Sequence, residues 1–301
     1  MSLHLEDAAV RRLLRLEDLL PALRLALIEF SAGRVFQPLR MVTDLPGGGF
    51  LMLKPAMTAD ALITKVITLR QGNAALGLPT MLATLLLMDP DTGQTLAVMD
   101  ATWLTELRTA AVSALAVDAL TPPGPKVVAM LGSGALARSH ALALRAVRPV
   151  SELRIWSRNP DNVARCAKDA GGVGSATAES AVRGADIVCT VTSASEPVLK
   201  GAWLKTGALV AAIGAPRPTW RELDDAAMRN VLVADSREAA EKESGDVILS
   251  GAKVSAEIGE ILAGTKPPPP QGATVIFKAL GQAVEDAVAA RLVYDAALRA
   301  R

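Results

Sequence analysis

The stretch Lys126–Val147, KVVAMLGSGALARSHALALRAV, decides the fold. An apolar run ends in Gly-Ser-Gly and passes directly into a segment with the apolar spacing of a helix. Gly132, Gly134 and Ala137 have the GxGxxA spacing, which provides a tight turn, a close approach to a pyrophosphate and helix-on-strand packing. A glycine turn before an ordinary buried helix is the alternative. Because the turn follows an apolar run and leads into a helical pattern, a nucleotide-binding turn is favoured. Ser133, Ala135 and Leu136 are expected to add contacts to the nucleotide.

The same alternation of apolar runs and helical patterns continues along the chain. ELRIWS (152–157), DIVCTVTS (186–193), GALVAAIG (207–214) and NVLVADS (230–236) are typical of buried parallel strands covered by helices on both faces. TPPGP (121–125) and KPPPPQG (266–272) are interpreted as linkers, because proline continues neither a helix nor a central strand. Residues 121–276 therefore indicate an α/β, Rossmann-type doubly wound domain.

Residues 1–120 have a different pattern and predict an α+β domain with a mostly antiparallel sheet. A helix is expected over 16–33 and another over 101–120. Between them come the expected strands VFQPLRMVT (35–43), GFLMLKP (49–55), ALITKVITL (61–69), TMLATLLLM (80–88) and QTLAVMD (94–100), with PGGG (46–49) as a turn.

The composition predicts a globular protein that acts on small molecules. Of 301 residues, 50% are hydrophobic, and 32 basic residues nearly balance 31 acidic ones, so nothing indicates a nucleic-acid or membrane surface. Cys166 and Cys189 are too isolated for a disulfide framework or a thiolate metal site. MSLHLEDAAVRR lacks a signal-peptide core, and no apolar run reaches the roughly 20 residues of a membrane span. We expect a cytoplasmic protein without a metal.

The end of the second parallel strand indicates the choice of cofactor. An NAD site usually places Asp or Glu there, but this chain has Ser157, Arg158 and Asn159. An arginine with neighbouring donors suits a 2′-phosphate, so NADPH is expected, with NADH at lower preference. The alternative is that Arg158 is a solvated loop residue.

Three cations of the first segment fall on apolar faces. Lys65 shares a strand face with Ile63, Ile67 and Leu69, and Arg40 shares one with Phe36 and Val42. Arg108 lies on the apolar stripe of Leu104, Ala111 and Leu115 in the expected helix. Buried cations are costly without an anionic partner, and a substrate carboxylate would provide one.

Structural roles are the alternative for each of these cations. Lys65 could extend its ammonium from a strand end to solvent, and Arg40 or Arg108 could pair with an acid such as Asp100 or Glu106. The histidines do not compete for catalysis: His4 lies near a frayed terminus, and a packing or phosphate-side role is expected for His140.

Taken in order, these motifs resemble the ornithine cyclodeaminase/mu-crystallin family, and within it the mu-crystallin-type ketimine reductases. The resemblance covers nearly the whole chain. It rests on QPLR (37–40), ALITK (61–65), LAVMD (96–100), RTAAVSA (108–114), LGSGALARSH (131–140), RIWSRN (154–159), GAPRPTWRELDD (214–225), KESGDVILSGA (242–252) and FKALGQAVEDAVAA (277–290).

The resemblance implies a homodimer whose substrate-binding and dimerisation domain, residues 1–120, is completed by 277–301. It implies that Arg40 and Arg108 hold the substrate carboxylate and that Lys65 lies near the reacting nitrogen as the catalytic residue. The strand-end loops that contact ribose and nicotinamide would include Thr190, Val191, Thr192, Ile213, Gly214 and Ala215.

Family membership leaves several reactions open, and Pro216 favours one of them. Cyclodeaminases carry an aspartate at this position, whereas proline cannot transfer a proton. The expected reaction is therefore reduction of a 2-carboxy-imine, Δ1-pyrroline-2-carboxylate or Δ1-piperideine-2-carboxylate, to L-proline or L-pipecolate. Two alternatives are an NAD-dependent ornithine cyclodeaminase and a non-enzymatic binding protein for a hydrophobic carboxylate.

Three positions depart from the reductase pattern and concern the substrate pocket. Lys54 and Met57 replace the methionine and tyrosine of a Met-Pro-Ala-Tyr motif, and Met81 replaces a histidine. Met57, Met81 and Pro216 are expected to line the pocket. Lys54 has two interpretations, a fourth pocket cation or an exposed residue at a strand end.

Overall fold

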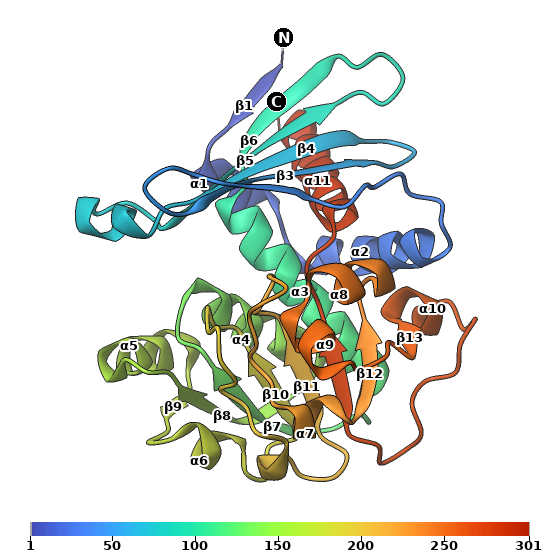
Figure 1. Cartoon of the computed structure of the whole chain (residues 1–301). Coiled ribbons are helices and arrows are strands. Elements are labelled where there is room, and N and C mark those ends of the chain that lie inside the picture. Colours follow the sequence, from blue (N-terminus) through green and yellow to red (C-terminus); the bar gives the residue numbers. More distant parts are fainter. Residues whose placement is uncertain (1, 301) are drawn as a thin grey trace. The chain divides into compact units, whose positions relative to one another are not determined.

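The computed structural model describes residues 2–300, which form two compact units (Figure 1). The first unit consists of the chain up to Arg108 together with the segment from Gln282 onward, and the second is Thr109–Gly281. These limits differ from the expected 120/121 and 276/277. Helix α3 (Thr102–Leu120) continues from one unit into the other, and β14 (Val275–Lys278) belongs to the sheet of the second unit.

The first unit contains a six-stranded sheet in the order β1-β6-β5-β4-β3-β2. All neighbours are antiparallel except β1 and β6, which confirms the mostly antiparallel sheet. Its strands are β1 (Leu3–Leu5), β2 (Met41–Asp44), β3 (Phe50–Met57), β4 (Leu62–Leu69), β5 (Met81–Met88) and β6 (Thr95–Asp100). The unit also has η1 (Gln71–Leu76) and the helices α1 (Asp7–Leu13), α2 (Leu16–Ser31) and α11 (Ala283–Arg299).

One face of this sheet forms the core of the unit. Alternate residues of β3, β4 and β5 are buried, as the period of a strand requires, and α11 packs against these strands (Figure 1). The opposite face keeps apolar side chains that are half-buried or exposed. The C-terminal segment therefore supplies the helix that covers the buried face.

Two expectations for the first unit were wrong. Of the expected strand 35–43, only residues 41–43 belong to a strand, β2 (Met41–Asp44), and Phe36 makes a single isolated bridge with Met57. Phe36 and Val42 are exposed, at 70% and 45%, so Arg40 does not share a buried strand face with them. His4 does not lie in a frayed terminus, because β1 pairs with β6.

The second unit confirms the doubly wound parallel sheet. Its order is β13-β12-β14-β11-β10-β7-β8-β9, and every pair is parallel. Besides β14, the strands are β7 (Lys126–Leu131), β8 (Val150–Trp156), β9 (Val173–Gly174), β10 (Ile187–Thr190), β11 (Leu209–Ala212), β12 (Val231–Ala234) and β13 (Ala256–Glu257). The helices are α4 (Ala135–Val147), α5 (Pro160–Ala170), α6 (Ala178–Val182), η2 (Gly201–Trp203), α7 (Asp225–Met228), α8 (Arg237–Glu243), α9 (Gly245–Ser250) and α10 (Ile258–Leu262).

The strand order reverses beside β7. The chain first adds β8 on one side of β7 and then places β10 on the other side. In open parallel sheets, ligands bind at the carboxyl ends of the strands where the order reverses. The Gly132 turn follows β7 at this point.

The two proline-rich segments lie inside the second unit, so neither links the two units, contrary to expectation. Both segments border one cavity of about 470 Å³ with Lys126 and Lys205. Within residues 2–300, no helix combines the length and apolarity needed to cross a bilayer.

Candidate active site

The candidate site in the first unit begins with two lysines on adjacent strands. Lys54 of β3 and Lys65 of β4 are directly opposite in the antiparallel register, on the face that packs against α11. Lys65 is fully buried, as its strand period predicted, and Lys54 is only 5% exposed. The interpretation of Lys54 as an exposed strand-end residue is therefore wrong.

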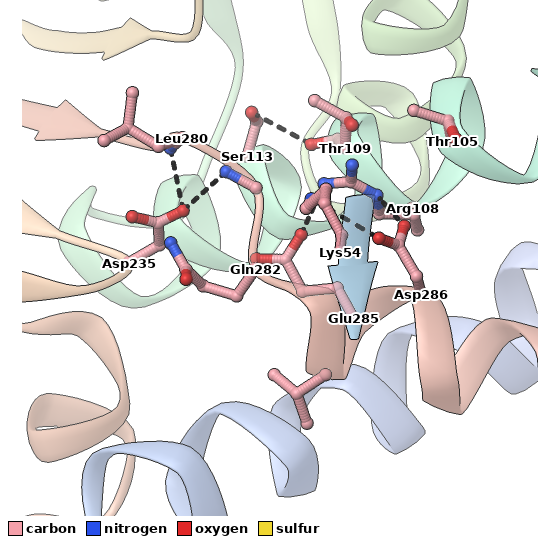
Figure 2. Close-up of polar contacts among 12 residues, drawn as sticks. Lys54, Thr105, Arg108, Thr109, Ser113, Asp235, Leu280, Gln282, Glu285 and Asp286 are labelled. Carbon is pink, nitrogen blue, oxygen red and sulfur yellow. Dashed lines mark hydrogen bonds and ion pairs between the residues drawn. The ribbon is translucent and has the colours of Figure 1, made fainter. Parts of the chain in front are cut away.

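Two acids of α11 provide the counter-charges. Asp286 Oδ1 accepts a hydrogen bond from Lys65 Nζ at 2.7 Å, and Asp286 Oδ2 lies 3.4 Å from Lys54 Nζ. Arg108 donates from a terminal nitrogen to Glu285 Oε2 at 2.6 Å, and its Nε lies 2.7 Å from Asp286 Oδ1 (Figure 2). Glu285 and Asp286 are both fully buried.

The acids that pair with Arg108 are thus not those expected from nearby sequence. Asp100 instead accepts a hydrogen bond from the backbone N–H of Thr102, at the start of α3. Glu285 and Asp286 lie in the first turn of α11, where acidic side chains also favour the helix dipole. Two adjacent acids in the apolar stretch AVEDAVAA (283–290) were the available signal for this pair, since a helix buried on that side must bury them.

The remaining bonds of Lys65 define its orientation. Its ammonium donates to Thr105 Oγ1 at 2.9 Å and to Asp286, and these are its two acceptors among the described residues. An ammonium has three N–H donors. One N–H of Lys65 is therefore left without an acceptor among the described residues.

Burial and neighbouring charges shift the pKa values of the cluster. Burial, with a smaller contribution from Arg108 and Arg40, lowers the pKa of Lys54 to about 8, against the opposing effect of Asp286. Burial also lowers the pKa of Lys65 well below its usual value, again against the attraction of Asp286. Burial opposes ionisation of Asp286, but the cations outweigh it and lower that pKa, so the carboxylate stays charged.

The cluster carries a positive surplus when both lysines are protonated. Lys54, Lys65 and Arg108 face two carboxylates, which leaves one positive charge. Arg40 is close enough to act on the pKa of Lys54 and adds another. Such a cluster favours a ligand that carries a carboxylate.

A glutamine places the segment that carries Arg40. Gln37 Oε1 accepts a hydrogen bond from the Val284 backbone N–H at 2.7 Å, and Gln37 Nε2 donates to Gln282 Oε1 at 2.7 Å. These bonds attach residues 37–40 to the start of α11, which also carries Glu285 and Asp286. The bonds therefore explain how Arg40 approaches the cluster without a buried strand.

Met57 and Met81, also expected to line the pocket, belong to the sheet of the first unit, and Pro216 belongs to the second unit. Met57 points to the opposite face of β3 from Lys54 and is exposed. Met81 is half-buried at the start of β5, opposite Leu69. Pro216 is half-buried in the second unit, after Ala215, which has a left-handed φ of 54°.

In the second unit, the glycine turn has the geometry that a dinucleotide requires. Gly132 has a φ of 128°, and a Cβ there would lie 2.8 Å from the carbonyl oxygen of Val191. A Cβ on Gly134 would meet nothing within 4 Å, so the backbone is open to a phosphate. Ala137 is buried against the sheet. The residues present thus fit a nicotinamide dinucleotide, with Ser133, Ala135 and Leu136 completing the turn.

The expected 2′-phosphate contacts lie at the end of β8. Ser157 Oγ is 2.7 Å from Ser133 Oγ, which ties this loop to the glycine turn. Asn159 Oδ1 accepts from the backbone N–H groups of Asp161 and Asn162 and so caps α5. Arg158 is exposed. Its guanidinium is therefore accessible from solution, whereas the side chain of Asn159, which is exposed as well, is engaged in the helix cap.

Glu222 organises the strand-end loops and was missed by the sequence analysis. Its buried carboxylate accepts hydrogen bonds from Thr190 Oγ1, Gly214 N and both donors of Thr192, at 2.6–2.8 Å. The hydroxyls expected to contact ribose are thus engaged inside the protein. Val191, Ile213 and Ala215 lie in the same loops. No local pattern identified Glu222, because its partners come from two other loops, at residues 190–192 and at Gly214.

His140 is buried in α4 and has a packing role. Ser113 Oγ lies 2.9 Å from its Nε2, and the Leu136 carbonyl lies 2.7 Å from its Nδ1. Burial lowers the pKa of His140 to about 4, although the Leu136 carbonyl favours the charged form. A neutral ring with its proton on Nδ1 satisfies both neighbours.

His140 should make the protein less stable in mild acid. Because its pKa is about 4 when folded and 6.5 when free, only the unfolded chain takes up this proton between those values. Because of this residue, the free energy of unfolding should be roughly 2 kcal/mol lower at about pH 5 than at about pH 7. His140→Gln should remove that part of the pH dependence in urea unfolding at both pH values. An unchanged pH dependence would exclude the histidine as its source.

Among residues 2–300, no group of three or more His, Cys, Asp or Glu side chains is placed to hold a metal ion.

Comparisons with known proteins agree on one family. The model of the ornithine cyclodeaminase/mu-crystallin family matches residues 2–301. The chain is 49% identical to the mouse (Mus musculus) ketimine reductase mu-crystallin, with 92% of this chain and 91% of the relative covered. It is 31% identical to a Bacillus cereus Δ1-pyrroline-2-carboxylate reductase, with 96% and 94% covered. The structure of Thermococcus litoralis Δ1-pyrroline-2-carboxylate reductase, solved with NADH and L-proline, has a TM-score of 0.94, 32% identity and coverage of 99% and 98%.

Proposed function

Because the chain belongs to the ornithine cyclodeaminase/mu-crystallin family, we propose that it reduces a 2-carboxy-imine to the L-amino acid with NADPH. The expected substrates are Δ1-pyrroline-2-carboxylate and Δ1-piperideine-2-carboxylate, which give L-proline and L-pipecolate. Relatives named as ketimine and pyrroline-2-carboxylate reductases support imine reduction. The observation that carries the proposal is the buried Lys65 ammonium, which keeps one N–H for a ligand within a positively charged cluster.

The arginines bind the substrate carboxylate in this proposal. Arg108 is held by Glu285 and Asp286, so its planar group is already ordered before a ligand arrives. A guanidinium has five N–H donors, and those not used by the two acids are available to a carboxylate. Arg40 adds a second positive charge from the segment anchored by Gln37.

Lys65 supplies the proton for the substrate nitrogen. A protonated imine accepts a hydride more readily than a neutral one, so a nearby acid accelerates the reaction. Burial makes the Lys65 ammonium a stronger acid than free lysine, and Thr105 and Asp286 fix its orientation. The bound NADPH supplies the hydride.

Preference for NADPH is expected to depend on Arg158. Replacing it with alanine should weaken NADPH binding by roughly 10- to 100-fold, as for a lost charge-assisted hydrogen bond, and should leave NADH binding unchanged. Binding is measured by the fluorescence of the reduced cofactor. Arg165→Ala, at an exposed arginine of α5, is the matched control. Equal losses for both cofactors would remove Arg158 as the source of the preference.

The first experiment on the function is an assay of cofactor oxidation. Loss of NADPH absorbance is followed with each cyclic imine, and L-ornithine with NAD is tested in parallel for ammonia. NADPH loss with formation of the L-amino acid supports the reductase. Ammonia release from ornithine would instead support the cyclodeaminase and mean that Pro216 does not exclude it. A lack of turnover in both assays would favour the binding protein.

A homodimer is part of the proposal, and the outer face of the first sheet supports it. Met41, Met57 and Leu82 lie on the face away from α11 and are 52%, 38% and 40% exposed. Half-buried Leu51 and Leu53 lie on the same face. Exposed apolar surfaces of this kind often mark interfaces. Light scattering should give twice the chain mass of 31.3 kDa, and a mass of one chain would contradict the dimer.

A further inference from the structure

The two carboxylate oxygens of Asp286 face different lysines. Oδ1 accepts a hydrogen bond from Lys65 Nζ at 2.7 Å. Oδ2 lies 3.4 Å from Lys54 Nζ and has no hydrogen-bond donor at shorter range among the described residues. The distance to Lys54 is that of an ion pair rather than a tight hydrogen bond. Asp286 therefore connects the two ammonium groups and remains able to accept a proton on the Lys54 side.

The two lysines differ in their access to solvent. Lys65 has no exposed surface, whereas Lys54 retains 5%. After Lys65 has given a proton to a substrate, its amine has no exposed surface at which to take a proton back from water. Asp286 joins Lys65 to two other cations, Arg108 and Lys54. Arginine does not release a proton at ordinary pH, so Lys54 is the one of the two that can supply a proton.

We propose that Lys54 returns a proton to Lys65 through Asp286 after each turnover. This inference rests on the proposed function, in which Lys65 protonates the substrate nitrogen. Lys54 is then a relay residue that acts through Lys65 and need not touch the substrate.

The proton and electron balance of the cycle is complete. The N–H bond of Lys65 breaks as an N–H bond forms on the substrate nitrogen, and the hydride from NADPH forms the new C–H bond. Lys65 is left as a neutral amine. The neutral Lys65 amine no longer helps to keep Asp286 ionised. Lys54 then gives a proton to Asp286 Oδ2, the short-lived neutral carboxyl group turns about its Cβ–Cγ bond, and Lys65 takes the proton. Water reprotonates Lys54, so each imine reduced consumes one NADPH and one solvent proton.

The charges around Lys54 are consistent with this role. Burial lowers its pKa to about 8, Asp286 and Glu285 favour the charged form, and Arg108 and Arg40 oppose it. Lys65 faces Lys54 from the adjacent strand. Lys54 thus holds a proton near neutral pH and releases it more readily than a solvent-exposed lysine.

Lys54→Arg separates the relay from simple charge attraction. Arginine keeps the positive charge beside Asp286 but does not release a proton at ordinary pH. With enzyme in excess over substrate, the first hydride transfer should stay within about twofold of wild type, because Lys65 starts protonated. The steady-state rate should fall by about tenfold or more and show a larger solvent isotope effect, because proton return becomes limiting.

Chemical rescue provides a second measurement. Lys54→Ala leaves space beside Asp286, so methylammonium should restore steady-state turnover in proportion to its concentration. Tetramethylammonium has the same charge but no proton to give, and it should not restore turnover.

The outcomes distinguish the relay from the function on which it rests. Lys54→Arg with a wild-type steady-state rate, or with equal losses in the first and later turnovers, overturns the relay and leaves imine reduction intact. Rescue by tetramethylammonium also overturns it, because charge alone would then suffice. Absence of imine reduction by the wild-type protein overturns the proposed function.

Discussion

Lys65→Met should abolish imine reduction while the protein still binds NADPH. Methionine is similar in length to lysine but has no ionisable proton. The variant therefore lacks the acid that protonates the substrate nitrogen, which should lower kcat by about 100- to 10,000-fold. Steady-state NADPH oxidation measures the loss, and cofactor fluorescence measures the retained binding. The NADPH-binding residues lie in the second unit, whereas Lys65 lies in the first.

Two controls make this result specific to Lys65. Lys168→Met makes the same substitution at an exposed residue of α5 and should leave kcat unchanged. The unfolding midpoint of Lys65→Met shows whether the variant is folded at the assay temperature. Full activity in folded Lys65→Met would remove Lys65 from the mechanism.

Asp286→Asn should strongly destabilise the protein. Asp286 is fully buried and contacts Lys54, Lys65 and Arg108, so the variant leaves three buried cations with one carboxylate, Glu285. Removing one partner from a buried ion network costs about 3–5 kcal/mol, because the remaining charges lose their compensation. Urea unfolding at neutral pH measures the change in the free energy of unfolding.

A matched variant in the same helix tests whether burial causes this loss. Asp295 pairs with Arg291 on the partly exposed side of α11, so Asp295→Asn should cost less than about 1 kcal/mol. Combining Asp286→Asn with Lys65→Met should recover part of the stability, because one uncompensated cation is removed. A loss for Asp286→Asn as small as that for Asp295→Asn would contradict the proposed electrostatic role.

The sequence by itself determined the features that depend on local periodicity. The apolar runs around Lys126–Val147 indicated a parallel sheet, because strands covered on both faces consist mostly of apolar residues. The strand period placed Lys65 on the buried face, and the helical period did the same for Arg108. The spacing of Gly132, Gly134 and Ala137 predicted the turn whose geometry the structure confirms.

Only the tertiary structure decided which groups these side chains meet. The period of the apolar residues identifies the buried face of a helix or strand, but it does not identify the element that packs against that face. Asp286 is 221 positions from Lys65 in the chain and reaches it only because α11 covers the first sheet. Glu222 likewise accepts hydrogen bonds from Thr190, 32 positions away, and from Gly214 in a second loop. The burial of Lys54 depends on the same packing of α11. Nothing in the neighbouring sequence distinguishes this lysine from one that is exposed at the end of a strand.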